Sequence, residues 1–87
     1  MTPRDRYLRR TYGITEAQYD EMLEAQHGVC ALCFRPPKSR RLHVDHDHKP
    51  PHRVRGLLCF RCNRALPDYL DAEWLRRAAD YLERSHG

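Results

Sequence analysis

The sequence predicts a small α+β domain in which two flanking helices pack on a short ββα unit. Three observations lead to this fold class: two helical patterns, two short alternating runs between them, and four cysteines in two Cys-x-x-Cys pairs. The chain has 87 residues, enough for a single domain over residues 1–87, and a mean hydropathy of −0.89. A core this thin usually needs a disulfide, a metal or a partner subunit for stability.

The first thirteen residues are basic and predict an arm or a short helix, and a strong helix pattern follows over residues 14–28. Thr15 is a good N-cap, and Gln18 three residues later completes a capping box. Gly28 stands where a helix of this length ends. We expect this helix to be part of the scaffold.

The centre of the chain predicts a β-hairpin followed by a short helix. Residues 42–45 alternate as in a strand, and residues 53–60 offer a second short strand beyond a Pro-rich loop. From Cys62 onward five residues suit a short helix, which Pro67 would end.

A second clear helix covers residues 71–84, with Asp71 as its N-cap. Its apolar stripe is formed by Trp74, Leu75, Ala78, Tyr81 and Leu82. We expect this stripe to pack on the core. In an alternative, this helix docks the chain onto a larger complex, with Trp74 and Tyr81 as anchors.

The cysteines form two pairs separated by 25 residues: Cys30, Cys33, Cys59 and Cys62. Two Cys-x-x-Cys turns supply the four ligands of a closed, structural Zn²⁺ site, and the alternatives are disulfides or buried free thiols. No apolar run approaches the roughly 18–20 residues that span a bilayer, and the N-terminus lacks the apolar stretch of a signal peptide. We therefore expect no membrane partner, a reducing cytoplasm and one zinc ion.

Basic residues are concentrated in the centre of the chain. The whole chain carries sixteen basic and twelve acidic residues, whereas residues 35–64 carry nine basic and two acidic ones. This segregation favours a polyanionic partner, most simply nucleic acid. The candidate contacts are Arg40, Arg41, Arg53, Arg55, Arg61 and Arg64.

The sequence HVDHDH, residues 43–48, holds three of the six histidines. Strand alternation would put His43, Asp45 and Asp47 on one face, with His46 and His48 opposite or in the turn. A polar turn, a His-rich transition-metal site and a divided catalytic site remain as interpretations. In a divided site a carboxylate holds a hard divalent cation while a neutral histidine takes a proton from water, which suits phosphodiester hydrolysis.

Asn63 follows the last cysteine directly. Its amide oxygen is a good ligand for Mg²⁺, although asparagine is also a common helix-cap residue. Together with Asp45 across a hairpin, Asn63 becomes a candidate second ligand of the cation.

The motifs YGIT, YDEML and CALC in the first half, HVDHDH, RVRGLLC and Cys-Asn in the centre, and RAADYL near the end cover roughly residues 12–83. In this combination the chain resembles the phage recombination endonuclease VII family, within the His-Me finger (HNH-type) nucleases. The resemblance implies a ββα-metal core stapled by zinc on the four cysteines. It also implies a phage or mobile-element protein that acts in a bacterial host.

The same resemblance assigns roles to the central residues. Asp45 and Asn63 would hold a catalytic Mg²⁺, for which Mn²⁺ or another divalent cation can substitute. His46 would be the general base, and His48 and His43 would lie near the phosphate to orient it or to stabilise charge. Products would carry 5′-phosphate and 3′-hydroxyl ends.

Two functional hypotheses follow. The leading one is a Mg²⁺-dependent endonuclease that nicks or cuts duplex or branched DNA. The alternative is a non-catalytic zinc module that binds nucleic acid through its central arginines. A homodimer and an association with phage packaging or recombination machinery are further predictions. Arg4, Arg6, Arg9 and Arg10 either extend the DNA footprint or form a solvated arm.

Overall fold

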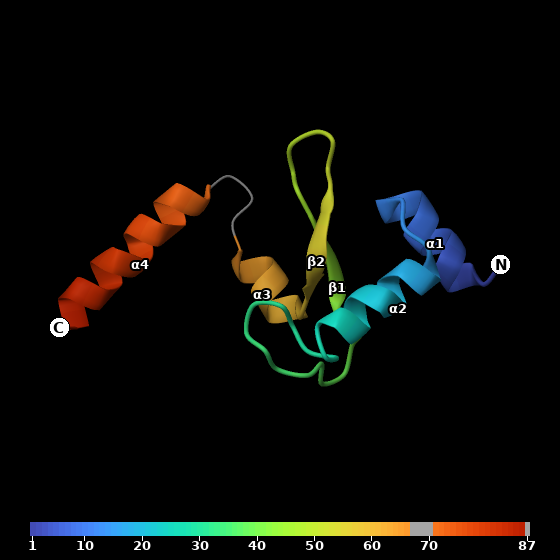
Figure 1. The fold of residues 1–87 in the computed structure, drawn as a ribbon, viewed down its shortest axis with the longest axis horizontal. Helices are drawn as coiled ribbons and strands as arrows, with labels where there is room; N and C mark the ends of the chain where they lie inside the picture. Colours follow the sequence, from blue (N-terminus) through green and yellow to red (C-terminus); the bar gives the residue numbers. More distant parts are fainter. Residues whose placement is uncertain (67–70, 87) are drawn as a thin grey trace.

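The computed structural model of the chain describes residues 1–66 and 71–86, and these form four helices and one two-stranded sheet (Figure 1). The elements in chain order are α1 (Pro3–Tyr12), α2 (Glu16–Ala25), β1 (His43–His46), β2 (Val54–Leu58), α3 (Phe60–Ala65) and α4 (Ala72–His86). The small α+β class is therefore confirmed.

The N-terminal segment is a helix, α1, and not an extended arm. Thr2 caps it by accepting a hydrogen bond from the backbone N–H of Asp5, and Gly13 ends it in the left-handed conformation, at φ 72°. Asp5 joins α1 to α2, because its carboxylate accepts hydrogen bonds from the backbone N–H of Glu16 at 2.8 Å and from Nε of Arg9 at 2.6 Å.

Helix α2 begins as predicted and ends earlier than predicted. The capping box is present: the backbone N–H of Thr15 donates to the Gln18 side chain at 2.7 Å, and the Gln18 N–H donates to the Thr15 hydroxyl at 3.0 Å. At the other end His27, at φ 58°, and Gly28, at φ 75°, both have left-handed backbone conformations. The N–H of His27 donates to Glu24 and the next N–H, that of Gly28, donates to Leu23, which completes a Schellman motif.

Strands β1 and β2 form an antiparallel hairpin, as predicted, with bounds that differ by one or two residues. The register runs from His43 opposite Leu58 to Asp45 opposite Gly56, and then shifts so that His46 lies opposite Val54. Arg55 is the extra residue of this bulge. The predicted alternation is therefore interrupted between Asp45 and His46.

The core lies between α1, α2 and the hairpin (Figure 1). Its buried apolar members are Leu8, Tyr19, Cys30, Leu42, Val44, Leu57 and Leu58. The Tyr19 hydroxyl donates to the backbone carbonyl of Leu42 at 2.6 Å inside this core.

Gln26 attaches the end of α2 to the middle of β2. Its side-chain carbonyl accepts from the N–H of Leu57 at 2.9 Å, and its amide donates to the carbonyl of Leu57 at 3.0 Å. The side chain thus pairs with Leu57 as a neighbouring strand would, and it holds the hairpin against the helix.

Helix α3 starts at Phe60, two residues before the predicted start at Cys62. Cys59 is the reason, because it serves as N-cap and its sulfur accepts from the N–H of Cys62 at 3.4 Å. The helix ends at Ala65, and Pro67 lies outside the described residues.

Helix α4 has the predicted N-cap, since the Asp71 carboxylate accepts from the N–H of Trp74 at 2.8 Å. The prediction that its apolar stripe packs on the core is wrong: Trp74, Tyr81 and Leu82 are 49%, 64% and 56% exposed. Figure 1 shows α4 leading away from the hairpin and from α1 and α2. Periodicity defines an apolar face, but it does not define what covers that face.

Candidate functional site

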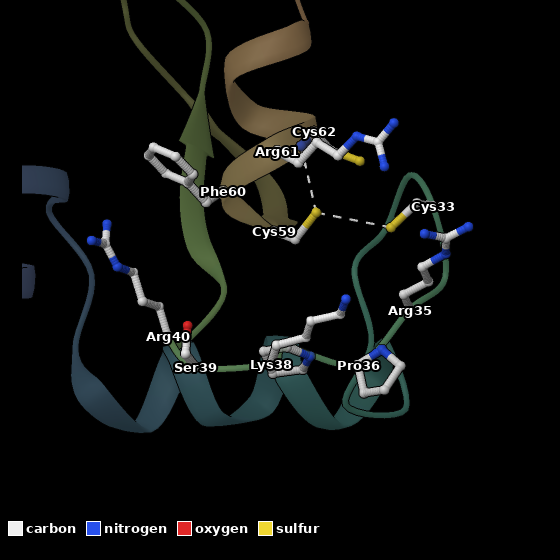
Figure 2. Close-up of a pocket in the computed structure, with 11 residues that line it drawn as sticks. Cys33, Arg35, Pro36, Lys38, Ser39, Arg40, Cys59, Phe60, Arg61 and Cys62 are labelled. Carbon is white, nitrogen blue, oxygen red and sulfur yellow. Dashed lines mark hydrogen bonds between the residues drawn. The ribbon is translucent and has the colours of Figure 1, made fainter.

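The four cysteine sulfurs lie within 4.8 Å of one another, although the cysteines come from two distant segments. The Sγ atoms of Cys33 and Cys59 are 3.9 Å apart (Figure 2). A tetrahedral zinc site with Zn–S bonds of about 2.3 Å has sulfur–sulfur edges of about 3.8 Å. The cluster therefore fits one zinc ion, and all four cysteines are free of disulfides.

Backbone hydrogen bonds hold the first cysteine pair in a tight knuckle. The N–H of Cys30 donates to the carbonyl of Arg35, and the N–H of Phe34 donates back to the carbonyl of Cys30, each at 3.0 Å. The N–H of Ala31 donates to Leu57, which ties the knuckle to β2 at 3.1 Å. This bond brings the first cysteine pair close to the second pair, Cys59 and Cys62, at the junction of β2 and α3.

The cysteine thiols differ in acidity. Burial by itself would raise the pKa of Cys30, but hydrogen bonds from the backbone at Cys33, Cys59 and Leu32 outweigh it and lower that pKa to about 6. Burial and hydrogen bonds among the thiols raise the pKa of Cys62 to about 12. One thiolate therefore forms easily, and ionisation of all four needs a cation in their midst.

Asp45 is a nearly buried carboxylate, 7% exposed, in the middle of β1. The guanidinium of Arg55 binds both of its oxygens, at 2.8 Å and 3.0 Å. The hydrogen bond with Asp45 raises the pKa of Arg55 further. The first predicted metal ligand is thus paired with a residue that was predicted to contact DNA.

Three histidine rings gather at the loop end of the hairpin, where β1 ends and β2 begins. The ring centroid of His46 lies 5.1 Å from that of His48 and 6.4 Å from that of His52. The ring centroid of Tyr12, from α1, lies 5.8 Å from that of His46. His52 and Tyr12 were not predicted, because the loop and α1 bring them to His46 only in the folded chain.

Two other predicted site residues, His43 and Asn63, lie at the start of β1 and on α3. His43, at the start of β1, packs its ring 5.6 Å from that of Phe60. Asn63 is half-buried on α3. Within residues 1–66 and 71–86, no hydrogen bond joins the Asn63 side chain to Asp45 or His46. In the same residues, the cysteines are the only cluster of three or more His, Cys, Asp or Glu side chains that could hold a metal.

All six predicted DNA-contacting arginines are exposed. Arg40 and Arg64 both lie over the ring of Phe60, each with its guanidinium carbon 5.3 Å from the centroid. Arg55 is the one whose guanidinium is bound to Asp45. Among the described helices none is both long enough and apolar enough to span a membrane.

A sequence model described as recombination endonuclease VII matches residues 5–84. The gene 59 protein of Mycobacterium phage D29 is 47% identical over 77 residues, which are 85% of this chain and 46% of that protein. The gene 59 protein of Mycobacterium phage L5 is 45% identical over 75 residues, 83% of this chain and 45% of its own length. The chain therefore spans less than half the length of either relative.

Proposed function

The chain belongs to the recombination endonuclease VII family, and from this membership we propose that it is a metal-dependent endonuclease that hydrolyses phosphodiester bonds in DNA. The observation that carries the proposal is the family match over residues 5–84, which includes all the candidate site residues from Cys30 to Arg64. The products would be 5′-phosphate and 3′-hydroxyl ends.

Asp45 and Asn63 are the residues that we propose as ligands of a catalytic Mg²⁺. Both offer hard oxygen donors, which is the ligand type that Mg²⁺ prefers, and Mn²⁺ or another divalent cation can substitute. The carboxylate of Asp45 is nearly buried and therefore needs a positive charge beside it. In this structure the guanidinium of Arg55 supplies that charge. A bound Mg²⁺ would offset the negative charge that develops on the phosphate.

His46 is the proposed general base. It follows Asp45 directly, it is half-buried, and the ring of Tyr12 restricts it from the side of α1. An imidazole that stays off the metal can accept the proton of the attacking water. His48 and His43 would orient the phosphate or stabilise its charge.

The exposed arginines would hold the DNA backbone. Contacts to phosphates position a protein on DNA without reading its sequence. Arg53 leads into β2, and Arg61 stands on the first turn of α3, so both flank the hairpin. The homodimer, the packaging or recombination machinery and action in the cytoplasm of a bacterial host remain predictions.

Nicking of supercoiled plasmid tests the proposal. With Mg²⁺ or Mn²⁺ the zinc-loaded protein should convert supercoiled plasmid to the open circle, and DNA ligase should reseal the nicks because their ends are 5′-phosphate and 3′-hydroxyl. His46→Ala should abolish nicking while zinc content stays unchanged. His27→Asn is the matched control, because His27 is exposed at the end of α2 and asparagine tolerates its left-handed backbone.

Equal nicking by His46→Ala and the unmodified protein would overturn the assigned mechanism. DNA binding that weakens steeply with salt, without cleavage in any divalent metal, would favour the alternative of a non-catalytic zinc module. That alternative needs only the exposed arginines and the cysteine cluster.

A further inference from the structure

A pocket of about 650 Å³ lies beside the cysteine cluster and is not used by the proposed reaction. Figure 2 shows its two sides: Phe60 and Arg61 at the start of α3, and the loop that carries Arg35, Lys38 and Arg40. The cysteines of both knuckles border it, so the cluster that staples the fold also holds the two sides of the pocket together.

The lining of the pocket combines positive charge with apolar surface. Four cations line it: Arg35, Lys38, Arg40 and Arg61. Phe60 and the pair Pro36 and Pro37 supply apolar surface, and none of the described residues that line it is acidic. A nucleotide has the matching parts, because its base is flat and weakly polar and its phosphate is an anion.

Phe60 is well placed to stack on a base. Phe60 is 44% exposed, so part of its side chain is open to a ligand. The guanidinium carbons of Arg40 and Arg64 each lie 5.3 Å from the centroid of the Phe60 ring, and both are exposed side chains that a base can displace. The backbone of Phe60 is held because Cys59, the preceding residue, caps α3.

The pocket adjoins the proposed catalytic strand. The ring of His43 on β1 lies 5.6 Å from that of Phe60, and His46 follows three residues later on the same strand. If one nucleotide of a DNA strand stacks on Phe60, the adjacent nucleotides of that strand would therefore lie near the hairpin.

We propose that this pocket holds one unpaired nucleotide of the DNA, with its base stacked on Phe60 and its phosphate among Arg35, Lys38 and Arg61. The inference rests on the proposed function, in that DNA is the molecule bound. The competing role for the four cations is to offset the negative charge of a zinc ion bound by four thiolates. In that role the pocket would bind no nucleotide.

Fluorescence anisotropy of labelled DNA tests the pocket. The zinc-loaded full chain is titrated, with Ca²⁺ in place of Mg²⁺, into a short oligothymidylate and into a duplex of equal length. Because one base–aromatic stack contributes about 1–3 kcal/mol, Phe60→Ala should weaken binding of the oligothymidylate about tenfold and leave duplex binding almost unchanged. Phe60→Trp should retain the affinity.

Phe34→Ala is the matched control, since Phe34 is the other phenylalanine, is 74% exposed and does not line the pocket. A second variant, Arg35→Gln with Lys38→Gln, removes two cations and keeps the Arg35 carbonyl that binds Cys30. It should lower the salt slope of oligothymidylate binding by about 1.4.

The proposal is overturned if Phe60→Ala keeps its zinc and binds the oligothymidylate as the unmodified chain does, or if it loses affinity for both DNAs equally. An unchanged salt slope in the Arg35 and Lys38 variant overturns it as well. If Phe60→Ala fails to fold, the result for the Arg35 and Lys38 variant alone decides the question. If the protein does not nick plasmid but these shifts appear, the proposed function fails and the pocket stands.

Discussion

The guanidinium of Arg55 binds both carboxylate oxygens of Asp45, at 2.8 Å and 3.0 Å. Arg55 is the extra residue of the bulge between β1 and β2, so the bulge is what turns this side chain onto its partner. The pair gives the nearly buried carboxylate a counter-charge in the part of the site where a divalent cation is proposed.

Arg55→Gln should therefore destabilise the protein and strengthen its response to Mg²⁺. The loss should be about 1 kcal/mol, because the Arg55 side chain is 45% exposed and water screens the pair. Added Mg²⁺ should raise the melting temperature of Arg55→Gln more than that of the unmodified protein, measured by circular dichroism. If Mg²⁺ raises the melting temperatures of Arg55→Gln and of the unmodified protein equally, Asp45 is not a ligand. The same conclusion follows if Mg²⁺ raises the melting temperature of Asp45→Asn as much as that of the unmodified protein.

Removal of zinc should unfold the chain. In the part of the chain that the structure describes, the apolar core has seven buried residues, and one of them is Cys30. A strong chelator should abolish the cooperative melting transition, and one zinc per chain should be released as the thiols are titrated. Cys62→Ser should bind zinc more weakly than a Ser39→Ala control. Unfolding by a reductant alone, with no effect of the chelator, would point to disulfides.

Gln26→Ala should lower the free energy of unfolding by about 1–3 kcal/mol, because it leaves the N–H of the buried residue Leu57 without its partner. Glu24→Ala, at an exposed site on the same helix, is the control. Urea denaturation of the zinc-saturated proteins measures both. Equal midpoints for the two variants would mean that the Gln26 pairing with β2 contributes nothing.

Tyr19→Phe should cost about 1–2 kcal/mol, since it removes the hydroxyl that donates to the carbonyl of Leu42 in the core. Tyr81→Phe removes a hydroxyl from a side chain that is 64% exposed and should be nearly neutral. Thermal melts of the two variants make the comparison. A neutral Tyr19→Phe would show that water satisfies the Leu42 carbonyl.

Acid should weaken the link between α1 and α2 through Asp5. The hydrogen bond from the Glu16 N–H, followed by that from Arg9, lowers the pKa of Asp5 below its ordinary 3.8. Since the folded-state pKa is the lower one, this contribution is complete above the unfolded-state pKa and disappears as the pH falls through the folded-state pKa.

Asp5→Asn should therefore lower the melting temperature at neutral pH, and its difference from the unmodified protein should shrink as the pH falls below 3.8. Asp20→Asn, on the exposed side of α2, controls for the lost charge and for zinc release in acid. A difference between Asp5→Asn and the unmodified protein that stays constant with pH would contradict the assignment.

Local patterns in the sequence were enough for several parts of the fold. The capping box of Thr15 and Gln18 and the N-cap Asp71 involve residues only three positions apart, so no tertiary contact is needed to form them. The hairpin follows from two short alternating runs with a Pro-rich loop between them. The cysteine cluster was predictable because each Cys-x-x-Cys turn already holds two sulfurs close together.

Tertiary structure alone decided the contacts that connect distant segments. The bulge that turns Arg55 onto Asp45 and the pairing of Gln26 with Leu57 depend on strand register and on helix docking, which no local pattern encodes. The exposure of Trp74 on α4 and of Phe60 beside the pocket was likewise unpredictable. The sequence does not show whether a given apolar residue is covered by a neighbour, because burial is a property of the assembled chain.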